Sequence, residues 1–341
     1  MNLVAVATGA VERVKLPDRI TRAGIAFLVD RTGRRLDGAS DEAERRFADA
    51  MDAFPIAVHA DAANAQHYEV PAEFFARVLG PRRKYSCCLY GNGAETLAEA
   101  EEQALAETIA HADLADGQRI LELGCGWGSL SLTMAARFPT ARITALSNSR
   151  TQRAYIVAEA RRLGLENIDV LTVDINDFDT HEKFDRVVSV EMWEHLSNWR
   201  ALLARVHGWL DRDGSLFLHV FSHRTAPYRF DHADKSDWIA QHFFTGGIMP
   251  SHRLINHLDQ HFTVARDWRW SGLHYQRTAE DWLANFDAAT AEIMALFRHI
   301  YGPAAGLWLR RWRLFFLATA GLFGADDGAA WGVSHYRLLP R

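Results

Sequence analysis

The most constraining feature of the sequence is the stretch 120–128, which reads Ile-Leu-Glu-Leu-Gly-Cys-Gly-Trp-Gly. Apolar residues flank Glu122, glycines follow at 124, 126 and 128, and an amphipathic run covers 129–138. This order predicts a strand, a tight glycine turn and a helix. Gly124 and Gly126 let the backbone turn sharply and approach a ligand, because no Cβ intervenes.

Strand and helix patterns alternate on both sides of this turn. We expect strands over 119–123, 142–147, 169–173, 184–190 and 215–221, and helices over 96–112, 129–138, 150–164 and 199–210. Such alternation predicts an α/β fold with a doubly wound, mostly parallel sheet. Ligands of these sheets bind beyond the carboxyl ends of the strands.

The two ends of the chain depart from this alternation. Residues 1–65 have apolar positions at helical spacing, which predicts a helical extension with one helix ending at Pro55, and a short helix follows over 67–75. Residues 222–252 are rich in histidine, aromatic residues and glycine and are predicted to form a lid over the site. A helix over 251–260, a strand over 262–270, helices across 279–324 and a final strand over 331–338 are expected to complete the chain.

Charge and cysteine content exclude several classes of function. The 341 residues carry a net charge of −5, so no basic excess points to nucleic acid as a partner. Three cysteines have no zinc-site spacing and form no disulfide framework, which predicts no metal site and fits a reducing cytoplasm. We expect no signal peptide, and the longest apolar run, 314–324, is too short to cross a membrane.

Charged residues follow the fourth predicted strand, where residues 189–195 read Ser-Val-Glu-Met-Trp-Glu-His. Carboxylates at the end of a buried strand are costly unless they are paired or functional. Glu191 and Glu194 share a face on a helical turn and can bind a cationic amine. One of them, or His195, can then remove a proton. The alternative is a cluster that only caps backbone amides.

The glycine turn follows the pattern E-x-G-x-G-x-G, which resembles the first motif of S-adenosylmethionine (SAM)-dependent methyltransferases. In such enzymes the end of the second strand binds the ribose, where this chain has Ser147 and Gln152 in place of an acidic residue. Asp174 follows the third strand, where it is placed to accept from the adenine amino group, and Ile175 to cover the base. The alternatives are a helix cap by Ser149 and a turn aspartate.

Motifs along the whole chain extend this resemblance. In order they are Tyr-Ser-Cys-Cys at 85–88, the glycine turn, Ser-Asn-Ser-x-x-Gln at 147–152, Val-Glu-Met-Trp-Glu-His at 190–195, Phe-Leu-His-Val-Phe-Ser-His at 217–223, Phe-Phe-Thr-Gly-Gly-Ile-Met-Pro-Ser at 243–251, Ser-Gly-Leu-His-Tyr at 271–275 and Val-Ser-His-Tyr at 333–336. Together they resemble the cyclopropane-fatty-acid synthase superfamily of methyltransferases, and within it the coclaurine N-methyltransferase branch. The resemblance runs from about residue 67 to the end of the chain.

This resemblance implies a Rossmann-like fold with seven strands and an antiparallel last strand. It implies a helical extension and cofactor cover over 1–112, followed by a methyltransferase domain over 113–341. It implies SAM as cofactor, S-adenosylhomocysteine (SAH) as product, and a cofactor site formed by Tyr85, Ser86, Gly124, Gly126, Ser147, Gln152, Asp174, Ile175 and Ser189. The implied catalytic residues are Glu191, Glu194, His195, His219 and Tyr275.

Two acceptors stay open at this point: a small amine, which we favour, and the unsaturated acyl chains of phospholipids. In the lipid enzymes a bicarbonate ion sits near positions that match Cys87, Glu194, His219 and Tyr275, and all four residue types are present here. Glu191 favours the amine, because the lipid enzymes commonly carry a small residue at the matching position. For an amine acceptor, bound bicarbonate is not expected. A non-catalytic SAM-binding or scaffold protein is the third alternative. For the assembly of the chain, a homodimer stays open as an option. The Arg- and aromatic-rich run 307–323 fits a core helix or a membrane-surface contact.

Overall fold

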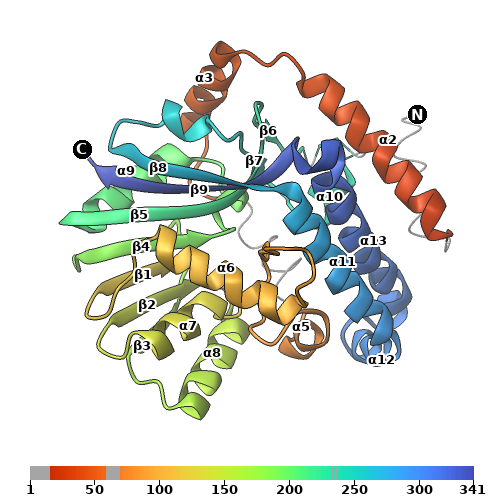
Figure 1. Ribbon diagram of the computed structural model, residues 1–341, viewed down its shortest axis with the longest axis horizontal. Helices are drawn as coiled ribbons and strands as arrows, with labels where there is room; N and C mark the ends of the chain where they lie inside the picture. Colours follow the sequence, from red (N-terminus) through yellow and green to blue (C-terminus); the bar gives the residue numbers. More distant parts are fainter. Residues whose placement is uncertain (1–15, 59–69, 232, 235–236) are drawn as a thin grey trace.

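A seven-stranded sheet forms the centre of the protein, seen in a computed structural model that describes residues 16–58, 70–231, 233–234 and 237–341 (Figure 1). Its order is β3 (Ile168–Thr172), β2 (Arg142–Ser147), β1 (Arg119–Leu123), β4 (Phe184–Val190), β5 (Leu210–His223), β9 (Trp331–Pro340) and β8 (Phe262–Ser271). The first five strands are parallel, whereas β9 is antiparallel to both of its neighbours. The predicted fold class, with its antiparallel last strand, is confirmed.

Helices α6 (Leu97–His111), α7 (Ser129–Arg137), α8 (Arg150–Leu163) and α9 (Trp199–Trp209) connect or cover the strands. Their ends follow local sequence rules. Thr96 and Glu99 form a reciprocal capping box at the start of α6, and the Ser149 side chain accepts from the Gln152 N–H at the start of α8. Gly164 ends α8 in the left-handed conformation that glycine adopts without strain. These four helices match the predicted ones to within one residue at each end.

A second layer of helices packs at the carboxyl ends of the strands. It consists of α5 (Ala72–Val78), α11 (Gly272–Ala288), α12 (Thr290–Tyr301) and α13 (Ala305–Phe323), with short 3₁₀ turns η4 (Gly302–Ala304) and η5 (Ala325–Gly328). Phe74 and Trp312 meet in its aromatic core with ring centroids 4.7 Å apart, and Phe316 is fully buried beside them. Helix α13 therefore buries much of its aromatic surface in the core. None of the described helices has the length and apolar character needed to cross a membrane.

The described part of the N-terminal extension runs from this second layer to helix α9. Helix α2 (Asp18–Leu36) is tied to α11 and α13 by the ion pairs Arg22–Glu280 and Asp18–Arg313, and α3 (Asp41–Asp49) with η1 (Ala50–Ala53) lies beside α9 (Figure 1). The predicted helix end at Pro55 fits the end of η1. The backbone N–H and C=O of Ala57 bond the side chain of Asn176, just after β3. The segment thus reaches the edge of the site. Of the predicted helix over 67–75, residues 70–75 are described, and α5 (Ala72–Val78) begins within them, shifted toward the C-terminus.

The segment after β5 forms four small elements: β6 (Tyr228–Arg229), α10 (Trp238–His242), β7 (Ile248–Met249) and η3 (Leu254–His257). Of these, β7 contacts β5 and η3 contacts β8. The expected helix over 251–260 is wrong, because only the 3₁₀ turn η3 forms there. Tertiary hydrogen bonds take the groups that a helix needs. Tyr336 donates its hydroxyl proton to the His252 carbonyl at 2.6 Å, and the His252 N–H donates to the His223 carbonyl at 2.9 Å.

Candidate active site

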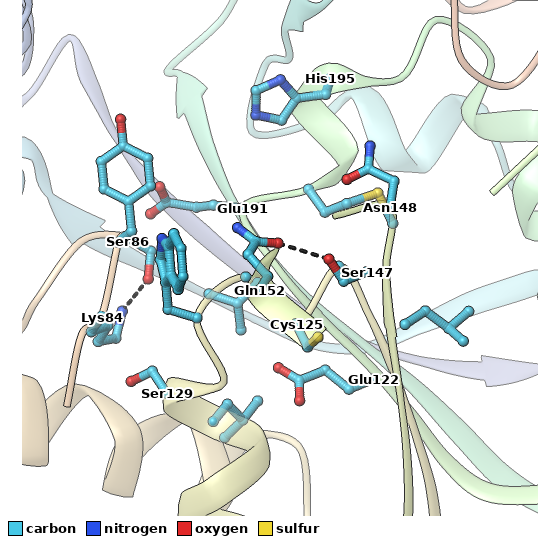
Figure 2. A pocket seen from close by; sticks show the side chains of 18 of the residues that line it. Lys84, Ser86, Glu122, Cys125, Ser129, Ser147, Asn148, Gln152, Glu191 and His195 are labelled. Atoms are coloured by element: carbon cyan, nitrogen blue, oxygen red, sulfur yellow. Dashed lines mark hydrogen bonds between the residues drawn. The ribbon is translucent and has the colours of Figure 1, made fainter. Parts of the chain in front are cut away.

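A pocket opens at the carboxyl ends of the parallel strands, where the fold class places ligands. The glycine turn after β1, the residues after β2, β3 and β4, and the segment 83–86 line it together with the second helix layer. Eleven of the predicted site residues are among the lining residues: Tyr85, Ser86, Gly124, Gly126, Ser147, Gln152, Asp174, Ile175, Glu191, His195 and Tyr275. Figure 2 shows Glu191 and His195 in one part of this pocket and Glu122 and Ser129 in another.

The glycine turn leaves room for a ligand at one position and for protein at another. Gly126 has a φ of +52°, and a Cβ placed on it would meet nothing within 4 Å, so the backbone borders open pocket space. Gly124 has a φ of +76°, and its Cβ would lie 2.5 Å from Met192 Cγ in the loop after β4. A side chain at Gly124 would therefore displace the loop that carries Glu191.

Polar groups at the ends of β2 and β3 face the same pocket. The Ser147 hydroxyl donates to Gln152 Oε1 at 2.7 Å and accepts from the Ser149 N–H at 3.0 Å (Figure 2). Asp174 accepts from the Asn176 N–H at 2.7 Å, so it acts as a turn aspartate while it also lines the pocket. A cap by Ser149 and a pocket-facing Ser147–Gln152 pair thus coexist.

Glu191 is the most constrained acidic residue of the site. It follows β4 with a φ of +48°, a left-handed conformation that is strained for a glutamate and is typical of functional positions. Its Oε1 accepts from the Cys87 N–H at 2.9 Å and lies 3.1 Å from His219 Nε2, while its Oε2 accepts from the Tyr275 hydroxyl at 2.6 Å. The carboxylate is therefore held by three groups from three different parts of the chain.

The electrostatics of Glu191 combine burial with a nearby cation. Burial raises the pKa of the Glu191 carboxyl, and this effect is opposed by the positive charge of Lys84 and by the hydrogen bonds from Tyr275 and Cys87. Lys84 is itself buried and donates to the Ser86 hydroxyl at 2.5 Å and to the Cys87 carbonyl at 2.6 Å. A carboxylate whose pKa is raised is a stronger base than an ordinary glutamate.

Three predicted residues lie outside the pocket wall. Within the described chain, Glu194, His219 and Ser189 are not among the residues that line the cavity. Glu194 is fully buried, accepts from the Phe221 N–H at 2.6 Å, and has a pKa raised well above its usual value by burial and then by the charge of Glu191. Ser189 donates to the Leu123 carbonyl at 2.7 Å and thereby joins β4 to β1. Of these three residues, His219 is the one that contacts a pocket-lining side chain, because its Nε2 lies 3.1 Å from Glu191 Oε1.

His195 and the segment 243–247 form a further wall of the pocket, beside the loop after β4. The His195 ring stacks on Phe244 with centroids 4.8 Å apart and an angle of 10° between their planes. A Cβ on Gly247 would lie 2.5 Å from the Glu194 carbonyl, so this glycine lets the segment pack directly on the loop after β4. Phe221, Phe244, Tyr275 and Phe315 give this end of the pocket an aromatic lining. The predicted lid segment thus contributes Phe244 to the site.

Two functional candidates were missed by sequence reasoning. Lys84 precedes the Tyr-Ser-Cys-Cys motif, but nothing in the sequence indicates that its ammonium is buried beside Glu191. Glu122 lies within the glycine motif, lines the pocket and accepts a hydrogen bond from the Ser131 hydroxyl. Burial raises its pKa to about 7. The sequence could have indicated Glu122, because it is the only acidic residue of the stretch 120–128.

Comparisons with known proteins agree with this geometry. The sequence profile of mycolic acid cyclopropane synthetases matches residues 58–327. The chain belongs to this family. Within the family it is 35% identical to the (S)-coclaurine N-methyltransferase of Thalictrum flavum subsp. glaucum over 285 residues, which cover 82% of this chain and 79% of that protein. It is 30% identical to the cyclopropane-fatty-acyl-phospholipid synthase of Escherichia coli strain K12 over 271 residues, which cover 79% and 66%.

A solved structure of the family resembles nearly the whole chain. The crystal structure of coclaurine N-methyltransferase bound to N-methylheliamine and SAH matches with a TM-score of 0.93 at 31% identity, covering 96% of this chain and 97% of that chain. The family member described here is therefore a SAM-dependent methyltransferase. The predicted cofactor fits the open space at Gly126 and the polar groups at the ends of β2 and β3.

Proposed function

We propose that this methyltransferase transfers a methyl group to the nitrogen of a small amine. The observation that carries the proposal is the Glu191 carboxylate, which is fixed at the end of β4 in an aromatic part of the pocket. An amine is mostly protonated at neutral pH, so it needs both a counter-charge and a base before its lone pair can react. Glu191 offers both.

The surroundings of the carboxylate suit a cationic acceptor. Aromatic rings attract an ammonium group through their electron-rich faces, and Phe221, Phe244 and Tyr275 line the pocket with Glu191. SAM, when bound, supplies an electrophilic methyl group. Glu191 draws the ammonium to this place and accepts one of its protons, while His195 and Phe244 limit the space available to the acceptor.

The hydrogen-bond donors around Glu191 argue against a lipid acceptor whose methylation depends on bicarbonate. The resemblance assigns bicarbonate in lipid cyclopropane synthases to positions that match Cys87, Glu194, His219 and Tyr275. Here the Cys87 N–H and the Tyr275 hydroxyl both donate to Glu191, and His219 Nε2 lies 3.1 Å from it. A carboxylate has the same planar pair of oxygens as bicarbonate. We infer that the fixed carboxylate of Glu191 takes the place of that ion.

The proposed acceptor is tested by supplying labelled SAM with two kinds of substrate. One set contains primary and cyclic secondary amines, and the other contains vesicles of unsaturated phospholipid, each assayed with and without bicarbonate. We expect label in one or more amines, no label in lipid, and no effect of bicarbonate. Label in the phospholipid but in no amine, or a loss of activity when bicarbonate is removed, would overturn the proposal in favour of the lipid reaction.

A further inference from the structure

Three buried histidines lie between Glu191 and the outside of the protein. His219 on β5 and His335 on β9 are direct partners in the register of the two antiparallel strands. His111 lies at the end of α6, which crosses the face of the sheet (Figure 1), and its ring stacks on Trp268 with centroids 3.8 Å apart. The chain thus brings together three histidines that are far apart in sequence.

Hydrogen-bond distances connect this row at both ends. His219 Nε2 lies 3.1 Å from Glu191 Oε1, at the pocket. At the other end His335 Nδ1 lies 2.8 Å from His111 Nδ1, and His111 Nε2 lies 2.9 Å from Glu107 Oε1. Glu107 is 45% exposed, whereas the Glu191 side chain is 6% exposed. The row therefore leads from an enclosed carboxylate to one that water reaches.

The central step joins the two fully buried rings. The centroids of His219 and His335 are 4.5 Å apart. His219 Nδ1 and His335 Nε2 are both buried and have no hydrogen-bond partner within the described residues. Unsatisfied buried polar atoms are uncommon in folded proteins and call for an explanation. Here the two unsatisfied nitrogens belong to neighbouring rings, at the one break in an otherwise connected row.

We propose that His219, His335 and His111 form a proton relay that joins Glu191 to solvent through Glu107. The inference rests on the proposed methylation of an amine, because that reaction releases one proton inside the pocket. With methyl donor and acceptor bound, Glu191 has little access to water, so the proton it has accepted needs another way out. The relay residues do not touch the substrate, and they act by returning Glu191 to its ionised form.

The relay balances without a further reactant. An N–H bond of the bound ammonium breaks and an O–H bond forms on Glu191. That proton then passes to Nε2 of His219. A rotation of one ring brings Nδ1 of His219 within reach of Nε2 of His335, and Nδ1 of His219 passes its own proton to that atom. His335 passes a proton from Nδ1 to Nδ1 of His111, and Nε2 of His111 gives one to Glu107. Glu107 releases the proton to water. Each histidine stays neutral and ends in its other tautomer, and a turn of each ring restores the starting tautomer before the next passage.

Neutral histidines are required for this exchange, and the surroundings keep them neutral. Burial, followed by the positive charges around them, lowers the pKa of both His219 and His335 well below the usual value. Burial also lowers the pKa of His111, with Glu107 opposing this change. The charged and titratable groups that act on the three rings are Lys84, Glu107, Glu191, Arg266 and Arg337, besides the rings themselves.

The first test compares His335→Phe with His252→Phe in the full-length enzyme. His335→Phe keeps an aromatic ring between the same strands but removes both nitrogens of the relay. His252 lies outside the row and bonds Ser334 and Asp267, so its replacement controls for the loss of a histidine packed on the same strand. We expect kcat for an amine to fall by about 10²-fold in His335→Phe, the lower end of the usual contribution of a proton-transfer group. The KM values and the SAM affinity should stay unchanged.

Solvent deuterium separates a relay from a packing role. In the wild type and in His252→Phe we expect kcat to fall in D₂O with a curved dependence on deuterium fraction, because several protons move together. In His335→Phe this dependence should become linear. An unchanged kcat, or a lower kcat with the wild-type deuterium dependence, would overturn the relay while leaving amine methylation intact. Absence of methylation of any amine by the wild type would instead refute the proposed function.

A second measurement needs no acceptor. The ring N–H protons of His219 and His335 can be followed by ¹⁵N NMR in the protein with SAH bound. The relay predicts that these protons exchange with water more slowly in His111→Phe than in the wild type, because their path to Glu107 is cut. Equal exchange rates in the two proteins would refute the relay, whatever the acceptor proves to be.

Discussion

Replacing Tyr275 by phenylalanine removes one hydrogen bond from the buried Glu191 carboxylate and should change its pKa in a calculable way. The Tyr275 hydroxyl donates to Glu191 Oε2 at 2.6 Å and lowers the pKa of that carboxyl. A hydrogen bond to a charged group contributes about 1.5–3 kcal/mol. One pKa unit corresponds to about 1.4 kcal/mol. Loss of the Tyr275 hydrogen bond should therefore raise the pKa of Glu191 by about one to two pKa units.

The sign of the effect on activity follows from the role of the ionised carboxylate. If Glu191 must be ionised to bind the ammonium, the acidic limb of kcat/KM should move to higher pH by about one to two pH units. The plateau at high pH should stay near the wild-type value. The assay is a pH–rate profile with labelled SAM and one amine. Tyr90→Phe is the matched control, because Tyr90 donates to a carboxylate, Asp281, that is not among the described residues lining the pocket. An acidic limb that does not move in Tyr275→Phe would show that ionisation of Glu191 does not set the lower pH limit of activity.

Three further predictions follow from the pocket. Gly126→Val should abolish SAM binding in calorimetry, because a branched side chain would enter the open space at a φ of +52°; wild-type binding would contradict the site. Phe244→Ala should raise the KM of the amine more than that of SAM, since Phe244 stacks on His195 in the aromatic wall, and equal effects would indicate misfolding. Glu194→Gln should change kcat only slightly, because an amide oxygen still accepts from the Phe221 N–H; a loss of about 10²-fold or more would restore Glu194 as a base.

The parts of the fold that depend on local patterns could be read from the sequence. The glycine turn, the strands before it and after it, and the caps of α6 and α8 each follow from residues that lie next to one another. The position of the pocket followed because parallel strands end at one edge of the sheet. Ser147 and Asp174 were found in this way, because Ser147 ends β2 and Asp174 lies just after β3, and Gln152 was found in the first turn of the helix that follows β2.

Features that depend on contacts between distant segments could not be predicted from spacing. Glu191 and Glu194 look equivalent in the sequence. Glu191 has a left-handed backbone and accepts hydrogen bonds from Cys87 and Tyr275. Glu194 is instead buried and accepts from the Phe221 N–H. The helix expected over 251–260 failed for the same reason, since bonds from outside the segment determine its backbone. The alignment of His219 with His335 likewise depends on the register of two strands that are more than a hundred residues apart.

In the proposed function, the carboxylate of Glu191 takes the place of a bicarbonate ion and acts as the base for an amine. Glu191→Gly tests it most directly, because glycine tolerates the φ of +48° and leaves the donors from Cys87, His219 and Tyr275 in place. We predict that amine methylation falls by about 10²–10⁴-fold with SAM affinity unchanged, and that added bicarbonate or formate restores part of the rate. A variant that binds SAM normally but is not rescued by either ion, or one that retains the wild-type rate without them, would show that Glu191 neither replaces bicarbonate nor acts as the base.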